Sequence, residues 1–346
     1  MKALTFLACH IMTIYKIAKL AGVSIATVSR VMNNSPKVTE STRRRVEAVL
    51  REAQFTPSAV ARSLATNATK TVGLLTSDVR DSYYANASYV IEQTCQAHGY
   101  QVILCNTGSE PDKKIAYLQM LLEKQVDGII LVGSGFAEPV LHAAIASAAA
   151  RVPIVTLNGD LALPGVSAVV CDDRRATADI ARYLCGAGRR DVLYLYDAET
   201  PSGRAKRQGF RDGMAAGGAD DVDDRIMRVA PGILGGLHGV AQATAAGHSF
   251  AAIVASDDLI AAGALRQVIA LGRRVPDEVA IFGFNNSALC LLTMPELTSV
   301  DNKVTASATT AADYLCAVLQ GQQVPARTVI APEIMLRASG NLGHNT

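Results

Sequence analysis

Apolar residues near the start of the chain recur at the spacing of an α-helix. Ile14, Ile17 and Ala21 would share one face of a helix that begins after Thr13, whose side chain can cap it. Gly22 follows this face directly. Because glycine readily adopts the left-handed conformation that ends helices, the pattern predicts a sharp turn at this position.

A second and a third helix are expected after that turn. Ser24 can cap the second helix, and Val28 and Val31 mark its buried face. The third helix is expected from Thr39, with Val46 packed inward. The exposed face of the second helix carries Ile25, Ala26, Thr27, Ser29 and Arg30. A helix, a glycine turn and a short polar helix predict a helix-turn-helix.

Two stretches of sequence make this prediction specific. The stretch from Thr13 to Ser35 reads TIYKIAKLAGVSIATVSRVMNNS, and the stretch from Pro57 to Leu64 reads PSAVARSL. Across about fifty positions they resemble the DNA-binding part of lac repressor family regulators. One departure is Lys16, which stands where many members carry an acid.

The resemblance implies how this part would contact DNA. Ile25, Ala26 and Arg30 would face base edges in the major groove, where an arginine can bond a guanine through two atoms. Contacts mostly to phosphates would come from Tyr15, Ser24, Thr27, Ser29 and Asn33. Thr27 and Ser29 could equally face only solvent. The resemblance also implies a short hinge helix that enters the minor groove of operator DNA through Ala61 and Leu64.

From residue 71 onward, short apolar runs alternate with helical patterns. The runs cover residues 72–75, 101–105, 128–132, 154–157, 192–196, 252–255 and 279–282. Such alternation predicts doubly wound parallel sheets, and the series restarts near Asp172, which predicts two lobes. The resemblance implies a periplasmic-binding-protein-like body in which the chain crosses between the lobes near Asp172, Asp301 and Pro332.

Ligands of such sheets bind beyond the carboxyl ends of the strands. Polar and aromatic side chains follow the expected strands at Asp78, Tyr83, Tyr84, Asn158, Asp172, Lys206, Asp257, Asp258, Asn285 and Asn286. Carboxylates and amides bind hydroxyl groups, and a tyrosine ring can cover an apolar sugar face. The sequence therefore predicts a hydroxyl-rich ligand between the lobes. Asp258 has the alternative role of capping a helix from Leu259.

The resemblance implies a narrower set of effector-binding residues. These are Tyr83, Tyr84, Asn158, Asp172, Thr200, Ser202, Lys206, Asp257 and Asn285. Two of them depart from the family pattern. Lys206 stands where most relatives have arginine, and Asn285 stands where most have aspartate.

Charge is distributed unevenly along the chain. Residues up to Lys70 carry a net charge of +8, whereas the remainder carries −6. A basic segment on an acidic body indicates contact with a polyanion, because neutralising phosphates releases counterions and drives binding to nucleic acid.

The sequence offers no catalytic constellation. It contains neither a GxSxG nor a GxxxxGK motif, and its six histidines lack the spacing of metal ligands. The seven cysteines form no CxxC pair, which is typical of buried thiols in a reducing cytoplasm. We therefore expect a cytoplasmic protein that is not an enzyme, needs no cofactor or metal and does not contact membranes.

Together these patterns predict an all-α helix-turn-helix head at residues 12–57 and an α/β body at residues 71–346. A hinge helix and linker would occupy residues 58–70, and residues 1–11 would be a disordered extension, with Met12 as an alternative start. Within the body, the first lobe would comprise about 71–171 and 302–331, and the second lobe about 172–301 and 332–340.

The expected function is sequence-specific transcription regulation, with repression as the default of the family. The partners would be a palindromic operator in double-stranded DNA, a second copy of the chain and a small polar effector. A sugar or glycoside is the favoured effector, and a nucleoside or another polar metabolite fits the same groups. Two alternatives are a periplasmic sugar-binding transport protein, and an enzyme or architectural DNA-binding protein without an effector. The basic head argues against the first, and the missing catalytic groups and the presence of an entire cleft argue against the second.

Overall fold

The computed structural model describes residues 13–32, 35–53, 68–219 and 222–343. The predictions for the first eleven residues, for Asn33 and for most of the hinge, including Ala61 and Leu64, lie outside these ranges. The chain divides into two compact units between Thr69 and Lys70. No described helix is long and apolar enough to cross a lipid bilayer.

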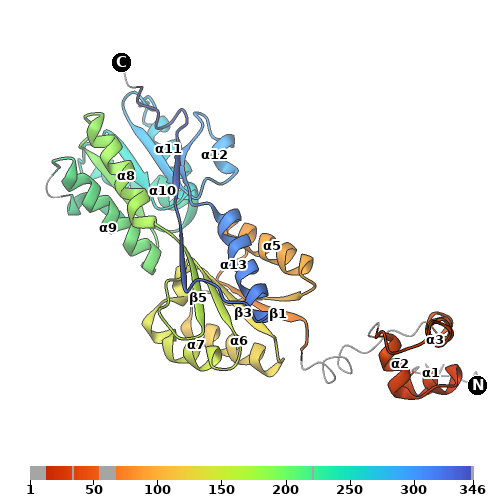
Figure 1. Cartoon of the computed structure of the whole chain (residues 1–346). Coiled ribbons are helices and arrows are strands. Elements are labelled where there is room, and N and C mark those ends of the chain that lie inside the picture. The colour runs from red at the N-terminus through yellow and green to blue at the C-terminus, as the bar shows by residue number, and fades with distance from the viewer. Residues whose placement is uncertain (1–12, 33–34, 54–67, 220–221, 344–346) are drawn as a thin grey trace, which may run out of the picture. The chain divides into compact units, whose positions relative to one another are not determined.

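Three helices form the head, as Figure 1 shows: α1 (Ile14–Ala21), α2 (Ile25–Met32) and α3 (Glu40–Glu52). Gly22 ends α1 with φ of 64°, the left-handed conformation that its position predicted. Ile17, Val28 and Val46 contribute one buried side chain from each helix to a small common core. The helix-turn-helix is thus confirmed, although the Thr13 side chain makes no capping hydrogen bond.

Each lobe of the body contains one six-stranded sheet. In the first lobe the spatial order is β11 (Arg327–Ile330), β5 (Val166–Cys171), β4 (Ile154–Leu157), β3 (Gly128–Val132), β1 (Thr71–Thr76) and β2 (Gln101–Asn106). All its pairings are parallel.

Helices cover both faces of this first sheet. The helices α5 (Ser82–Ala97) and α13 (Val304–Leu319) pack on one face, with Leu74 and Val132 beneath them. The helices α6 (Pro111–Glu123) and α7 (His142–Ala149) pack on the other, with Leu75 and Leu131 beneath them. Successive residues of one strand therefore face opposite layers, as a buried strand requires. Two single-turn helices, η1 (Ser134–Phe136) and η2 (Pro139–Leu141), follow β3.

The second lobe repeats this plan. Its sheet has the order β12 (Glu333–Met335), β10 (Thr298–Asp301), β9 (Ala280–Phe284), β8 (Ala252–Ala255), β6 (Val192–Tyr196) and β7 (Ile226–Arg228). One face is covered by α8 (Asp173–Gly186) and α9 (Pro201–Ala216), and the other by α10 (Gly232–Ala245) and α11 (Asp258–Ala270). Two short helices complete it, η3 (Asp223–Arg225) and α12 (Leu289–Leu292).

The predicted doubly wound α/β class is confirmed, with one refinement. The edge strand β12 pairs antiparallel with β10, while the other pairings of the second sheet are parallel. The chain passes between the two lobes three times, after Cys171, after Asp301 and after Ile330. Figure 1 shows these three segments side by side between the lobes.

Candidate functional site

The exposed face of α2 carries the side chains that the sequence assigned to DNA. Ser24, Ile25, Ala26 and Arg30 are exposed on it, whereas Thr27 and Ser29 are half-buried. Tyr15 is exposed on α1. The Ser24 hydroxyl accepts a hydrogen bond of 3.1 Å from the Thr27 amide, so it caps α2 as the sequence predicted.

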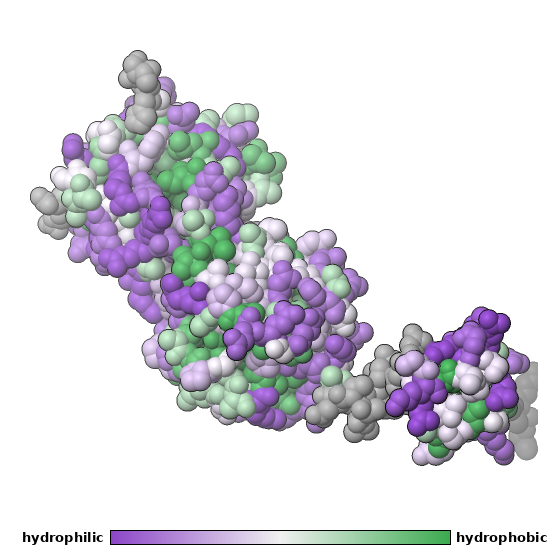
Figure 2. Space-filling model, viewed as in Figure 1, coloured by the Kyte–Doolittle hydropathy of each residue, from purple (hydrophilic) through white to green (hydrophobic). Residues whose placement is uncertain are grey.

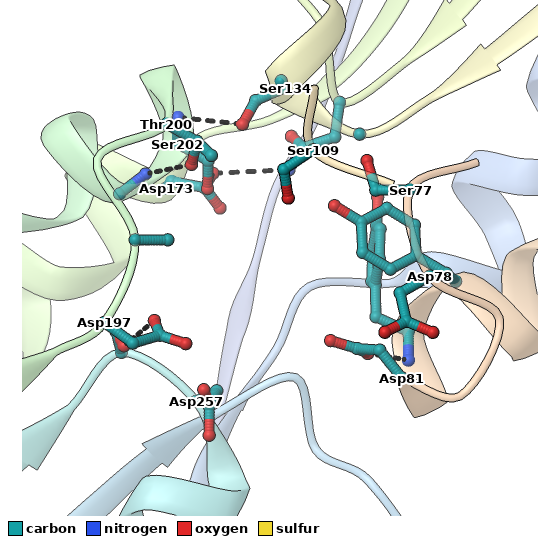
Figure 3. Close-up of a pocket in the computed structure, with 18 of the residues that line it drawn as sticks. Ser77, Asp78, Asp81, Ser109, Ser134, Asp173, Asp197, Thr200, Ser202 and Asp257 are labelled. Atoms are coloured by element: carbon teal, nitrogen blue, oxygen red, sulfur yellow. Dashed lines mark hydrogen bonds between the residues drawn. The ribbon is translucent and has the colours of Figure 1, made fainter. Parts of the chain in front are cut away.

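A polar cleft of about 500 Å³ opens between the lobes of the body, at the carboxyl ends of strands from both sheets. Figure 3 shows its walls facing each other. Of the nine predicted effector-binding residues, eight line it: Tyr83, Tyr84, Asn158, Thr200, Ser202, Lys206, Asp257 and Asn285. A cleft of this size and polarity can enclose a small hydroxylated metabolite.

Two tyrosines at the start of α5 form the aromatic part of the first-lobe wall. The rings of Tyr83 and Tyr84 contact edge to face, with 5.3 Å between centroids. Burial raises the pKa of both phenols, so both remain neutral hydrogen-bonding groups. Gly133 makes room for Tyr84, because a Cβ built on this glycine would lie 2.7 Å from the Tyr84 ring. Its φ of 108° also favours glycine.

The second-lobe wall comes from the turn between β6 and α9. The Thr200 hydroxyl caps α9 by accepting a hydrogen bond of 3.2 Å from the Gly203 amide. Lys206 is buried one turn further along this helix. Its ammonium group donates to the Ser256 carbonyl oxygen at 3.0 Å and lies 3.6 Å from the centroid of the Phe284 ring.

Asp257 joins this wall from the end of β8. Its carboxylate accepts a hydrogen bond of 2.8 Å from the Ile260 amide and so caps α11. Burial raises its pKa to about 7, Asp197 acts in the same direction, and Lys206 opposes both. The sequence analysis gave Asp258 as an alternative cap of this helix, and that prediction is wrong because Asp257 is the cap. Asp258 is the first residue of α11, is buried and accepts hydrogen bonds from the Ser287 amide and the Ser299 hydroxyl.

Two asparagines of the cleft have left-handed backbones, Asn158 with φ of 57° and Asn285 with φ of 104°. Asparagine tolerates positive φ better than most residues do. The Asn285 side-chain oxygen accepts a hydrogen bond of 2.9 Å from the Asn302 amide. The Asn285 side chain is therefore held by the Asn302 side chain.

Asp172 lies beside the cleft, in an adjoining pocket that it lines together with Asn158, Asp173 and Ser202. Its carboxylate caps α8 by accepting a hydrogen bond of 3.1 Å from the Arg175 amide, and its side chain does not line the cleft. The neighbouring Asp173 lines the cleft instead. One Asp173 oxygen accepts hydrogen bonds from the Ser202 hydroxyl and, at 3.5 Å, from the Asn158 amide. Both aspartates follow β5, and the predicted residue differs from the observed one by a single position.

The prediction omitted several other residues of the cleft: Ser77, Asp81, Lys114, Ser134, Asp197, Ser256 and Asn302. Asp81 and Asp197 follow β1 and β6 closely, so the rule that placed Asp78 at a strand end could have found them. Lys114 lies inside α6, so the strand-end rule does not predict that it lines the cleft.

Direct contacts bridge the lobes beside the cleft. The Ser202 amide donates a hydrogen bond of 3.1 Å to the Ser134 hydroxyl, and Arg204 forms an ion pair of 3.1 Å with Glu138. Ser134 and Glu138 belong to the first lobe, whereas Ser202 and Arg204 belong to α9 of the second. A change in the angle between the lobes would break these two contacts.

Comparison with known proteins agrees with this architecture. The family described as "Bacterial regulatory proteins, lacI family" matches residues 13–58. The family described as "Periplasmic binding proteins and sugar binding domain of LacI family" matches residues 69–330. The two matches divide the chain much as its two compact units do.

Individual relatives match over most of their length. An HTH-type transcriptional regulator of Lachnoclostridium phytofermentans is 39% identical over 333 residues, covering 95% of this chain and 100% of that protein. The HTH-type transcriptional repressor PurR of Serratia proteamaculans is 32% identical over 290 residues, covering 83% of this chain and 84% of that protein. These names confirm the expectation of a regulator and not an enzyme.

A solved structure shares the fold of nearly the entire chain. The crystal structure of the lac repressor dimer bound to operator and the anti-inducer ONPF has a TM-score of 0.86 and 22% identity, and the match covers 95% of this chain and 98% of that one. Family descriptions, relatives and fold agree on one assignment. The protein belongs to the LacI family of DNA-binding transcriptional regulators.

Proposed function

We propose that this regulator is a repressor that acts in the cytoplasm, binds a palindromic operator as a homodimer and is controlled by a sugar or glycoside in the interlobe cleft. The observation that carries the proposal is the pairing of an exposed α2 face bearing Arg30 with an interlobe cleft lined by polar side chains in the same chain. One surface suits a polyanion, and the other suits a small hydroxylated molecule.

The lining of the cleft supports a sugar. Carboxylates and amides from both lobes can accept and donate hydrogen bonds to neighbouring hydroxyls, and the Tyr83 and Tyr84 rings can cover an apolar ring face. The contacts between Ser134 and Ser202 and between Glu138 and Arg204 would respond to a ligand held between the lobes. Control requires that the effector bind two interlobe arrangements unequally.

An exposed apolar surface supports the homodimer. Leu291, Leu292 and Met294 at α12 have 60%, 80% and 87% of their surface exposed. Ile233 and Leu234 at the start of α10 are also exposed. Figure 2 shows apolar side chains gathered over the part of the second lobe where Figure 1 draws α12. Apolar patches of this kind mark interaction sites, and a dimer would place two heads on one palindrome.

The testing experiment is operator binding at fixed salt, with a palindrome selected from random sequence and with a panel of sugars. We expect selective binding that one class of sugar shifts. The Arg30→Ala variant should lose about tenfold to a hundredfold in affinity for the selected operator. Binding that is indifferent to both sequence and sugar would contradict the proposal.

Oligomeric state provides a separate test of the interface. The Leu292→Lys variant should shift sedimentation from dimer to monomer, because a charge cannot be buried unpaired in an apolar contact. The Val140→Lys variant is the matched control, because Val140 is 61% exposed on the first lobe, away from α12. A wild-type protein that sediments as a monomer would contradict the dimer.

A further inference from the structure

Four carboxylates of the cleft form no ion pair with any residue that the structure describes. Asp81, Asp173, Asp197 and Asp257 line it, and none forms an ion pair with another residue in the described ranges. The two other acids of the lining are paired. Asp78 binds Arg80 at 2.6 Å, and Glu138 binds Arg204 at 3.1 Å.

The cations of the lining are already engaged by the protein. Among the described residues that line the cleft, these cations are Lys114 and Lys206, and both are buried. The Lys114 ammonium donates to the Gly135 carbonyl oxygen at 3.0 Å. The Lys206 ammonium donates to the Ser256 carbonyl oxygen at the same distance. Two occupied ammonium groups therefore face four unpaired carboxylates.

The helix ends at the cleft are also occupied. Helix N-termini bind anions through their free amides. Here Asp81 accepts from the Tyr83 amide at the start of α5, Thr200 caps α9 in the same way, and Asp257 caps α11. Two of these caps are carboxylates, so the chain's own anions take the positions that a phosphate or a carboxylate ligand would use.

Buried acceptors in the lining lack donors. Asp173 and Asn302 each have 5% of their surface exposed. One carboxylate oxygen of Asp173 and the side-chain oxygen of Asn302 have no hydrogen-bond partner among the described residues. Buried acceptors without donors cost free energy, so a ligand rich in N–H and O–H groups would be favoured here.

The unpaired carboxylates lie on both sides of the space that a ligand would fill. Figure 3 shows Asp197 and Asp257 on the second-lobe wall and Asp81 on the wall opposite. The negative charge of Asp197 also disfavours ionisation of Asp257 and is one cause, after burial, of the raised pKa of Asp257. A cation between these walls would neutralise charge from both lobes at once.

We propose that the cleft selects an effector that carries a protonated amino group among its hydroxyls, such as an amino sugar, and rejects phosphorylated or carboxylated sugars. The inference rests on the proposed function, since it names the chemical class of the effector in the same cleft. The ammonium group binds between Asp81 of the first lobe and Asp197 and Asp257 of the second, and the hydroxyls donate to the free acceptors of Asp173 and Asn302.

Two sets of matched probes test the inference by calorimetry near neutral pH. The first set compares glucosamine, galactosamine and mannosamine with their parent sugars and with the 6-phosphates of those sugars. The second set compares protonated tris(hydroxymethyl)aminomethane with pentaerythritol, a neutral molecule of the same shape, so that the result does not depend on sugar stereochemistry. We expect each amine to bind about tenfold more tightly than its neutral counterpart, and the phosphates to bind most weakly.

Variants locate the effect. Asp197→Asn keeps shape and removes charge, so it should weaken binding of the amine about tenfold more than binding of its neutral parent sugar. Asp81→Asn is a second variant that retains a capping oxygen on α5. The matched control is Asp277→Asn, because Asp277 is exposed on the second lobe beside Arg274 and does not line the cleft.

The outcomes separate this inference from the proposed function. Neutral or phosphorylated sugars that bind as tightly as the amines, and that shift operator binding, overturn the amine preference and leave the proposed function standing. An amine advantage that survives in both Asp197→Asn and Asp81→Asn also overturns it. A cleft that binds no member of either set overturns both proposals.

Discussion

The head and the body present their functional side chains in opposite ways. In the head, Ile25 and Arg30 are exposed on one face of a helix of only eight residues, above a core that depends on side chains such as Val28. In the body, Lys206 and Asp173 are recessed between two large lobes. In the proposed function, the head reads a partner larger than itself, whereas the body encloses one that is smaller.

The difference shows what each site depends on. The side chains of α2 that are predicted to contact DNA share one helix. Their arrangement therefore depends mainly on correct folding of the head. The cleft takes residues from the ends of β1, β4, β6, β8 and β9, so it depends on how two sheets are held. A substitution can therefore remove one function and leave the other intact, and four substitutions test this separation in order of decreasing effect.

The largest effect is expected for Val28→Asp in the core of the head. Val28 is fully buried, and an unpaired charge at this position costs several kcal/mol, more than so small a core can supply. Operator binding should be lost while the main thermal transition and effector binding of the body remain. Glu52→Gln on the exposed end of α3 is the control. Loss of effector binding in Val28→Asp would show that the two functions are not separable.

A smaller effect is expected for Gly133→Ala in the cleft. The new Cβ would lie 2.7 Å from the Tyr84 ring at φ of 108°, so the body should lose about 2–4 kcal/mol of unfolding free energy and most of its effector affinity. Gly99→Ala is a matched control, because Gly99 also has positive φ, 79°, but has open space around it. Equal losses of effector affinity in the two variants would contradict a specific role for Tyr84.

The pH dependence of body stability should reveal Asp257. The pKa of the Asp257 carboxyl is about 7 in the folded body and near 3.8 in the unfolded chain. Between pH 3.8 and 7 the folded state therefore binds a proton that the unfolded state does not. Stability from this group is present at low pH and declines as pH rises through 7, by about 1–3 kcal/mol. Asp257→Asn keeps the cap and should flatten that decline in urea unfolding between pH 5 and about 8. An unchanged slope would contradict the raised pKa.

The smallest effect is expected for Asp172→Ala. Removing the cap of α8 should cost about 1 kcal/mol of stability and leave effector binding unchanged, because Asp172 does not line the cleft. Calorimetric titration beside thermal unfolding measures both quantities. Asp172→Asn retains a capping side chain and should recover the stability. A weaker effector affinity in Asp172→Ala would show that Asp172 does take part in effector binding.

Much of the fold could be predicted from the sequence, because long buried runs and helical faces repeat regularly. Seven strands were expected, and β5, β7, β10, β11 and β12 were not. The edge strands β7 and β12 span three residues each, too few for a pattern to repeat. β5 contains Ser167 within its apolar run, and β11 alternates between exposed and half-buried residues at the edge of its sheet.

The site was less predictable than the fold. A strand-end rule finds the neighbourhood of a ligand but not which of two adjacent aspartates turns inward, as Asp172 and Asp173 show. Lys114 reaches the cleft from a helix interior, and its place there follows only from the packing of α6 beside β1 and η2. The distribution of charge in the cleft was equally hidden, because Asp78 and Glu138 form ion pairs with arginines, whereas the Asp197 carboxylate forms none with the residues that the structure describes.

The three crossings between the lobes determine when each part can fold during synthesis. The head is encoded in one early segment, so it can fold while the ribosome is still translating the body. The first sheet cannot be completed until β11 emerges, because this strand adds to β5 across about 155 residues of intervening chain. A nascent chain that pauses before residue 327 would therefore carry a finished DNA-reading head on an unfinished sensor.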